Sequence, residues 1–314
     1  MLDSQQAPAI RVPVRLVSVP TVVASREGKY IPGLMATDFH VSDNGQEKPF
    51  TVDTYSASLS IAVAIQVDRN VRDYLPFVSR VGNLIESAVA AEGGEIALLT
   101  YSDAVAVEKS FASGELSAIL RNISPSGHGA RMVDAGMKTI ELLATRDPSH
   151  SRVLLLIGQP VDDGSQGKVN ELLAKAEEHN VQIYTLRIPL LDKAFVSDSF
   201  QLYGLSDQGW RGGYQASVEL TRAVPALRRA AKAADQKDPL SFLAIATGGL
   251  QLSFRKQGQL ENDLIAMGDA LRSRYLLSFV PESDDAGYHR IRVTVNVPGA
   301  TVYARPGYRS VPSR

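Results

Sequence analysis

The two ends of the chain carry the alternating pattern of β-strands that bury one face. From Ile291 to Val297 every second residue is apolar, and the residues between them are polar or charged. This period of two indicates a half-buried strand. Residues 10–55 show a similar pattern of strands. Asn44-Gly45 between apolar residues predicts a tight hairpin, because a type I′ turn needs positive φ at both central positions, which Asn and Gly adopt readily. Both ends are therefore predicted to be all-β.

Two features of the N-terminal segment predict where its strands lie. Pro13 and Pro20 interrupt the apolar run. Because proline donates no hydrogen bond to a neighbouring strand, both residues indicate edge strands or bulges. The alternation resumes from Phe50 to Val52, which we expect to form the return strand after the Asn44-Gly45 turn.

The middle of the chain alternates buried strands with helices. The runs Leu59–Val67 and Val153–Ile157 are almost wholly apolar, which is typical of central strands that are covered on both faces. Helical spacing of apolar residues follows the strands. The predicted helices are 71–91, 115–122, 131–145, 168–179, 239–247 and 260–271. Alternation of strands and helices implies right-handed crossovers and a mostly parallel sheet.

Local signals predict the course of two further elements. Strands at 96–101 and 104–111 are joined by the tight Ser102-Asp103 turn, so we expect them to be antiparallel. Asp238-Pro239 is a typical helix start, with aspartate as N-cap and proline in the first turn. Gly248-Gly249 is a typical stop for the same helix.

These elements predict an α/β domain inserted in a β-sandwich. The α/β domain, with a doubly wound and mostly parallel sheet, spans 58–272. The flanking segments 10–57 and 273–314 are too short to be stable sheets alone, so we expect them to pair with one another. Residues 1–9 are read as a flexible polar lead-in. Residues 190–237 are read as an irregular excursion, either a lid over the sheet or a segment that contacts a partner.

Composition narrows the classes of function. The 314 residues include 33 Lys and Arg against 34 Asp and Glu, which gives no support for a nucleic-acid partner. There is no cysteine, which excludes disulfides, zinc–thiolate sites and thiol nucleophiles. No apolar run has the length of a membrane helix, so no membrane span is expected. The N-terminus shows neither the basic nor the apolar region of a signal peptide.

A site is expected where the central strands end. In a doubly wound sheet, ligands bind outside the carboxyl ends of the strands. Asp68 directly follows the first central strand, and two interpretations stay open with about even weight: a functional carboxylate or the N-cap of the next helix. His128 lies in a loop expected at the same edge. It is either part of the site or an exposed loop histidine.

The order of these motifs resembles the von Willebrand factor A domain, in particular the bacterial "VWFA-related" family. Asp68-x-Asn70-x-Arg72 after a buried strand is similar to the first motif of that domain. Further similar segments are the hairpin 96–111, Gly129–Ala135, Val153–Ile157, Thr247–Gly249, Val14–Val23, Gly33–Val41 and Arg305–Tyr308. The resemblance implies a Rossmann-like sheet, a role in adhesion or protein–protein interaction through a metal site, and a periplasmic or secreted location.

The metal site that this resemblance implies is degenerate here. Its positions correspond to Asp68, Asn70, Arg72, Ala130 and Gln159. Mg²⁺ needs oxygen ligands, whereas Ala130 offers none, Gln159 carries no charge and Arg72 repels a cation. We therefore expect no cofactor, and an ion pair of Arg72 with Asp68 in place of the metal. The weaker alternative is Mg²⁺ held by Asp68, Asn70 and Asp162.

The sequence therefore favours a non-catalytic interaction module that works without a metal. Its partner would be another protein or a second copy of this chain, bound at the strand ends or through residues 190–237. Two alternatives remain: a hydrolase-like enzyme using the crevice around Asp68, and a structural protein associated with the cell envelope. Clustered acid–base groups would favour the enzyme, and only Asp68 and His128 are candidates.

Overall fold

A computed structural model gives the arrangement of these elements. It describes residues 16–26, 30–54, 58–76, 78, 82, 85, 86, 89, 94–112, 116–147, 149–188, 201–203, 238–253, 271, 274–281 and 287–310. The lead-in 1–9, nearly all of the helix predicted at 260–271, and the excursion 190–237 apart from 201–203 lie outside the described residues.

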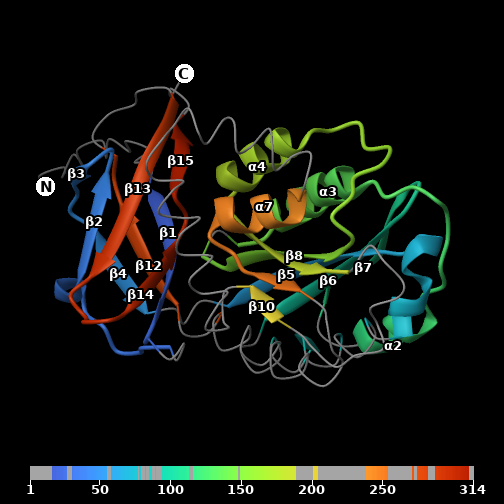
Figure 1. The fold of residues 1–314 in the computed structure, drawn as a ribbon, viewed down its shortest axis with the longest axis horizontal. Helices are drawn as coiled ribbons and strands as arrows, with labels where there is room; N and C mark the ends of the chain where they lie inside the picture. The colour runs from blue at the N-terminus through green and yellow to red at the C-terminus, as the bar shows by residue number, and fades with distance from the viewer. Residues whose placement is uncertain are drawn as a thin grey trace, which may run out of the picture.

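Two four-stranded antiparallel sheets form a sandwich from the two ends of the chain (Figure 1). Their strands are β1 (Val17–Ala24), β2 (Phe39–Asp43), β3 (Gln46–Glu47), β4 (Thr51–Thr54), β12 (Tyr275–Phe279), β13 (Gly287–Val295), β14 (Thr301–Ala304) and β15 (Gly307–Ser310). The order is β14-β1-β12-β4 in one sheet and β15-β13-β2-β3 in the other. The predicted pairing of the two end segments is present, since β1 pairs with β12 and β2 with β13.

The sandwich core is built by the alternating positions that the sequence marks. Val19, Val41, Leu277 and Ile291 come from four strands of the two sheets and belong to one buried cluster. The polar neighbours of Ile291 along β13 face solvent instead. This arrangement buries one face of each sheet, as the period of two predicts.

Two predictions for the N-terminal segment were wrong. Residues Thr51–Thr54 do not return beside β2 but cross to the other sheet and pair with β12, and only Gln46–Glu47 complete the hairpin. Pro20 lies in β1, which is a central strand rather than an edge. Its missing N–H is tolerated because β14 pairs with β1 only from Thr21 onward.

The α/β unit has a seven-stranded sheet of order β10-β11-β9-β8-β5-β6-β7. The strands are β5 (Leu59–Gln66), β6 (Glu95–Tyr101), β7 (Val105–Ala112), β8 (Ser151–Gly158), β9 (Val181–Arg187), β10 (Gln201–Tyr203) and β11 (Gln251–Ser253). The five inner strands are parallel, and the two edge strands β7 and β10 are antiparallel. The predicted mostly parallel sheet is confirmed.

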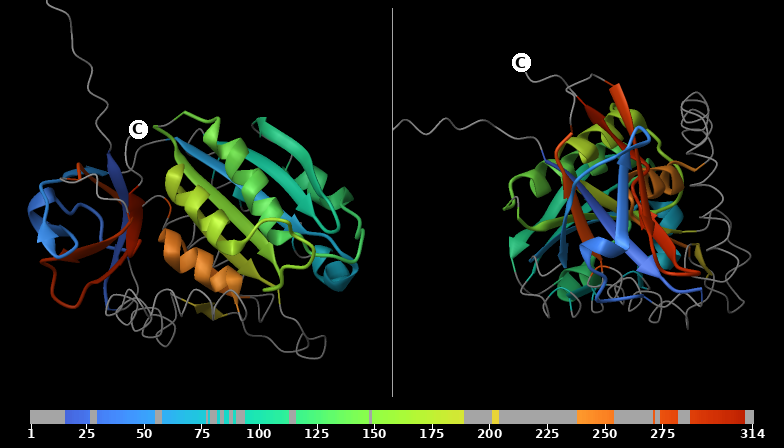
Figure 2. Two further views of the ribbon diagram at one scale, coloured as in Figure 1. Left: turned by 90° about the horizontal axis from the view of Figure 1, so that it is seen from above. Right: turned by 90° about the vertical axis from the view of Figure 1, so that its left-hand side faces the viewer.

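Helices cover both faces of this sheet. They are the 3-10 helix η2 (Arg69–Tyr74), α2 (Leu116–Asn122), α3 (Met132–Ala144), α4 (Val169–Glu178) and α7 (Pro239–Thr247), and a short 3-10 helix, η1 (Ala36–Asp38), lies in the sandwich segment. Figure 2 shows α3, α4 and α7 side by side over one face, and α2 lies below the other in Figure 1. No helix within the described ranges has the length and apolarity to cross a membrane.

The central strand β5 contributes to the core on both faces. Ile61, Val63 and Ile65 belong to the cluster on one face, and Ala62 and Ala64 belong to the cluster that includes α3. Every residue of β5 is buried. This double burial is what a nearly continuous apolar run predicts.

Helix α7 shows the predicted start and stop signals. The Asp238 side chain accepts a hydrogen bond from the Ser241 amide at 3.1 Å, and Pro239 begins the helix. Gly248 ends it in the left-handed conformation, with φ at 74°. The helix is thus bounded by local chemistry at both ends.

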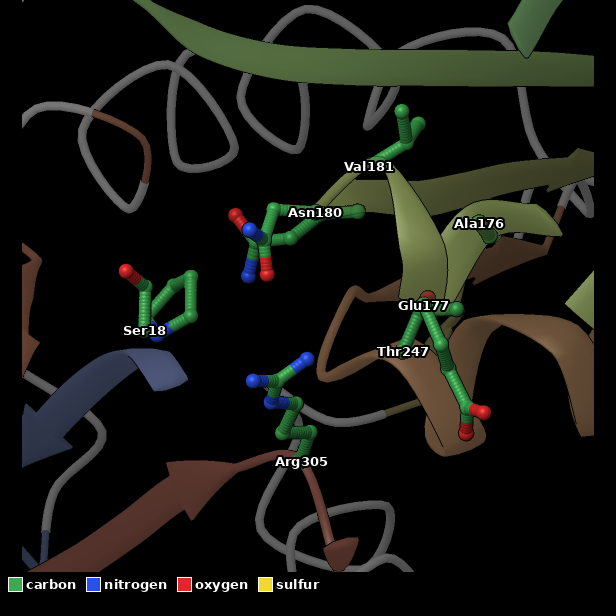
Figure 3. A pocket seen from close by; sticks show the side chains of 9 residues that line it. Ser18, Ala176, Glu177, Asn180, Val181, Thr247 and Arg305 are labelled. Carbon is green, nitrogen blue, oxygen red and sulfur yellow. The ribbon is translucent and has the colours of Figure 1, made fainter. Parts of the chain in front are cut away.

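The sandwich and the α/β unit meet through charged residues. The buried guanidinium of Arg274 donates to the side chains of Gln182 and Ser151. A small pocket at this junction includes Ser18 of β1, Asn180 before β9, and Arg305 after β14 (Figure 3). Arg305 and Asn180 reach into it from opposite sides in Figure 3.

Glu177 of α4 also lines the junction pocket. Burial raises the pKa of Glu177 to about 7, although the positive charges of Arg305 and Arg309 act in the opposite direction. Tyr288 of β13 also lies close, since the charge of Glu177 contributes to its raised pKa, after burial as the main cause. The junction therefore contains a carboxyl group that titrates near neutral pH.

Glu177→Gln is expected to raise the free energy of unfolding at about pH 8, with a smaller gain at about pH 5. The unfolded glutamate ionises near 4.5 and the folded one near 7, so ionisation reduces stability as the pH rises through this window. Chemical denaturation at both pH values measures the difference. Glu178→Gln, at an exposed neighbour on the same helix, is the control. An equal gain at both pH values would contradict the assignment.

Candidate functional site

The order of the central strands reverses beside β5. The chain passes from β5 to β6 on one side and later returns to β8 on the other side of β5. Crossovers in opposite directions leave a crevice outside the carboxyl ends of the two strands. Asp68 follows β5, and Gln159 follows β8, so both lie at this edge.

Gln66, the last residue of β5, links the ends of the two strands. Its side-chain Oε1 accepts a hydrogen bond from the Gln159 amide at 2.7 Å, and its Nε2 donates to Asp68 Oδ2 at 3.1 Å. Gln66, Asp68 and Gln159 are all buried. Because buried polar groups must find partners within the protein, this bridge fixes the position of the Asp68 carboxylate.

Asp68 caps the short helix η2. Its Oδ1 accepts from the Asn70 amide at 2.9 Å, and its Oδ2 accepts from Asn70 Nδ2 at 3.2 Å. With the bond from Gln66, the carboxylate has three donors. The capping interpretation of Asp68 is therefore confirmed by the geometry.

Tyr101, at the end of β6, completes the buried base of the edge. Its hydroxyl donates to the Ile157 carbonyl at 3.3 Å, and a β-carbon at Gly158 would overlap that hydroxyl, so only glycine fits there. Burial raises the pKa of Tyr101, and the negative charges of Asp68 and Asp162 raise it further. The phenol is thus held neutral between two carboxylates.

The loop 124–131 is fastened over the ends of β5 and β6. Asp103 accepts hydrogen bonds from the amides of His128 and Gly129 at 3.0 and 2.7 Å, and these bonds lower the pKa of its carboxyl group. The Ser126 amide donates to the Val67 carbonyl at 2.7 Å. The loop therefore has a fixed path, although the side chain of His128 is exposed.

The start of α3 and the loop after β8 hold each other. Asp162 Oδ1 accepts from the Val133 amide at 2.8 Å and from the Ser165 hydroxyl at 2.6 Å. In return, Asp134 accepts from the amides of Gln166 and Gly167. Desolvation raises the pKa of Asp162, and the charge of Asp134 adds to this effect. Asp162 thus caps α3 from outside the helix.

Comparison with known families identifies the α/β unit. The family model of the von Willebrand factor type A domain matches residues 60–207. The chain contains a von Willebrand factor type A domain. The match begins in β5 and includes η2, the 124–131 loop and the loop after β8. The strand edge around Asp68 therefore lies within the matched residues.

Solved structures with a similar course of the chain include three proteins of low sequence identity. The first is a conserved hypothetical protein BatB from Bacteroides thetaiotaomicron, with 13% identity and a TM-score of 0.42, and the match covers 67% of this chain and 99% of that chain. The second is an aerotolerance-related membrane protein from Bacteroides fragilis NCTC 9343, with 10% identity, a TM-score of 0.44 and coverage of 67% of this chain and 98% of that chain. The third is the VWA domain of SpRpn10, with 11% identity, a TM-score of 0.39 and coverage of 67% of this chain and 94% of that chain. A search of curated proteins found no match. The family assignment rests on the sequence model of the domain.

The positions predicted for the metal site of the von Willebrand factor type A domain lie together at this edge. Asp68 and Gln159 are linked through Gln66, and Ala130 pairs through its backbone with Asp163. Asn70 and Arg72 lie on η2, and both are exposed. The expected ion pair between Arg72 and Asp68 does not form, because Asp68 is occupied by Gln66 and Asn70.

The residues at this edge of the von Willebrand domain fit a divalent cation poorly. The Asp68 carboxylate already accepts three hydrogen bonds, and Asp162 is engaged in capping α3. Ala130 contributes a buried methyl group. Within the described ranges, no three carboxylate, histidine or cysteine side chains are grouped so that they could hold a metal ion together. The donor set therefore suits a hydrogen-bonded edge better than a metal centre.

Sequence reasoning missed Gln66, Tyr101 and Asp103, which position the edge. Gln66 is a polar residue within an otherwise apolar strand, and this was the available signal, since a buried amide must find partners. Tyr101 is similarly the last residue of a buried strand. Asp103 gave no signal, because its partners are backbone amides of a distant loop.

Gln66→Leu is expected to lower the free energy of unfolding by about 2 kcal/mol or more, since it leaves the Gln159 amide and one Asp68 contact without a partner. Urea denaturation of the full chain measures the change. Gln166→Leu replaces an exposed glutamine at the same edge that binds Asp134 through its backbone amide, and it should change stability little. Equal effects of the two substitutions would contradict the bridging role.

Proposed function

We propose that the von Willebrand domain is a non-catalytic protein–protein interaction or adhesion module, and that it binds its partner without a metal ion. One observation carries the proposal: four carboxylates of the strand edge accept hydrogen bonds from within the protein, whereas several polar side chains beside them are exposed. The engaged carboxylates are Asp68, Asp103, Asp134 and Asp162. The exposed side chains are Arg69, Asn70, Arg72 and His128.

Such an edge is suited to recognition because its backbone is already ordered. The bonds from Gln66, Asp103 and Asp134 hold the loops before any partner arrives. A preorganised surface loses less conformational entropy on binding than a loose one. Exposed arginines can then form charge-assisted hydrogen bonds with carboxylates of a partner protein or of a second copy of the chain.

The hydrolase alternative finds less support. A nucleophile needs an adjacent base and access to a substrate. Among the described residues, the His128 side chain has no hydrogen-bond partner at the strand edge, and His128 binds Asp103 through its backbone amide. A serine–histidine contact does exist at the opposite ends of the strands, where Ser60 Oγ lies 3.0 Å from His150 Nδ1. Ser60 is fully buried and donates to Glu95 at 2.7 Å, which is the arrangement of a structural network.

We place the protein outside the cytoplasm, in the periplasm or secreted, as the family resemblance implies. A purely structural envelope protein would need no ordered set of exposed polar residues at one edge of its sheet. The fastened loops around Asp68 therefore favour a binding role.

Arg72→Glu is expected to reduce recovery of the partner by about tenfold, because it reverses a charge at the proposed contact surface. The measurement is a quantitative pulldown on the immobilised full chain, in EDTA and again in Mg²⁺. Arg121→Glu, an exposed arginine on α2, is the matched control and should leave recovery unchanged. Equal recovery of the partner by both variants would show that the strand edge is not the contact surface. Recovery of the partner only in Mg²⁺ would disprove metal independence.

Isothermal titration with Mg²⁺ or Mn²⁺ is expected to show no binding in the micromolar range. The reason is the occupied Asp68 carboxylate and the absence of an oxygen ligand at Ala130. The Asp68→Ala variant is titrated in parallel. Micromolar binding that disappears in this variant would overturn the proposal of a metal-independent module.

A further inference from the structure

The sandwich has a basic pocket of its own on the outer face of the sheet β15-β13-β2-β3. We call it the arginine pocket; its lining residues are Ser42, Asn44, Gly45, Arg290 and Arg292. It has a volume of about 320 Å³. It lies on strands β2 and β13, and β2 is on the side of the sandwich away from the α/β unit in Figure 1. It is therefore separate from the strand edge around Asp68.

The two arginines of the pocket share one face of β13. Ile291 between them points into the core, while the Arg290 and Arg292 side chains point outward. Outward residues two positions apart in a strand are about 7 Å apart. Like charges on neighbouring outward positions repel, so the two arginines provide no attractive ion pair to each other. Their placement therefore calls for another explanation.

Carboxylates near the pocket are engaged elsewhere. Asp43 is buried beneath the sheet, where it accepts from Tyr308 Oη at 2.8 Å and contacts His289 Nδ1 at 3.2 Å. Glu47 forms an ion pair with His40 at 2.8 Å. Among the residues that the structure describes, neither Arg290 nor Arg292 has an ion-pair partner.

The wall of the pocket is held in place by the hairpin turn. Asn44 and Gly45 have φ of 50° and 86°, as the predicted type I′ turn requires. The Asn44 amide donates to the Arg290 carbonyl at 2.8 Å, and Asn44 Oδ1 accepts from the Arg290 amide at 2.9 Å. The turn and the arginine strand therefore form one rigid unit, with the Ser42 hydroxyl opposite Arg292.

We propose that the arginine pocket binds an extended acidic peptide segment of a partner protein, with carboxylates at alternate positions. An extended chain places side chains i and i+2 on the same side at about 7 Å, which is also the repeat at which Arg290 and Arg292 leave the backbone of β13. Arginine binds carboxylate through two parallel hydrogen bonds. A Glu-x-Glu segment thus matches the pocket in charge and in repeat.

The size and openness of the site favour a peptide over a single small anion. A volume of about 320 Å³ is at the lower end of the range for ligand pockets, and it exceeds the space that one phosphate or carboxylate needs. Ser42 adds a hydroxyl that can bond to the peptide backbone or to a carboxylate. This second contact surface goes beyond the function proposed for the strand edge, and it does not depend on it.

The test uses the full chain and a fluorescent peptide of sequence Thr-Glu-Thr-Glu-Thr, with Thr-Gln-Thr-Gln-Thr as the uncharged control. Fluorescence anisotropy is expected to show binding of the glutamate peptide alone. Arg290→Gln and Arg292→Gln should each weaken it about tenfold or more, because each removes a charge-assisted pair. Arg121→Gln, on α2, should not weaken it. Glu47→Gln should strengthen it, because it removes a negative charge on β3, directly opposite Ser42 of the pocket.

Several outcomes would overturn the proposal. Equal binding of both peptides, or equal affinities of the Arg290→Gln and Arg121→Gln variants, would show that the arginines are not the contact. Inorganic phosphate that binds as tightly as the peptide at equal ionic strength would make this a small-anion site. Peptide binding only in an Asp284→Asn/Asp285→Asn variant would show that the chain's own acidic segment is the occupant. Pulldown through the strand edge should be unaffected by Arg290→Gln, so a failure here leaves the first proposal standing.

Discussion

The complete burial of β5 is the constraint on which the rest of the α/β unit depends. Its eight residues lie between β6 and β8, and both faces are covered by side chains of the helices and neighbouring strands. No water reaches the strand, so the polar groups at its carboxyl end must be satisfied by the protein. Gln66 meets this need by binding both Asp68 and Gln159. The fixed loops at the site follow from that requirement.

The same constraint separates this edge from a typical cation site. A buried carboxylate that is satisfied by amide donors needs no positive ion to compensate it. Asp68 is in this position, and Asp162, although exposed, likewise accepts a hydrogen bond from the first turn of α3. The exposed arginines of η2, Arg69 and Arg72, remain available at the edge. This arrangement supports the proposal that the edge binds carboxylates of another protein rather than a metal ion.

Much of the fold was predictable because its signals are local. The double burial of β5, the Asn44-Gly45 turn and the Asp238 cap each depend on neighbouring residues, and all three are present. The crossing of Thr51–Thr54 to the other sheet was not predictable, because alternation marks a strand without naming its partner. The edge position predicted from Pro20 was wrong for a related reason. A proline is tolerated in this central strand because β14 begins to pair with β1 only after it, which the local sequence does not show. At the site, Asp68 could be predicted because it directly follows a buried strand. Asp103 could not be predicted, because it binds the backbone of a loop that is distant in sequence.

The way in which the α/β unit is inserted also bears on the order of folding. It enters after β4 and leaves before β12, and these two strands are paired, with Thr54 opposite Tyr275. The ends of the insertion are therefore neighbours in space. Once the α/β unit has folded, β4 and β12 are joined by a short effective loop, and closing the sandwich costs much less entropy than closing it around an unfolded insertion. The topology thus favours a folding order in which the α/β unit forms first and the strands of the sandwich pair afterwards, beside its two adjacent ends.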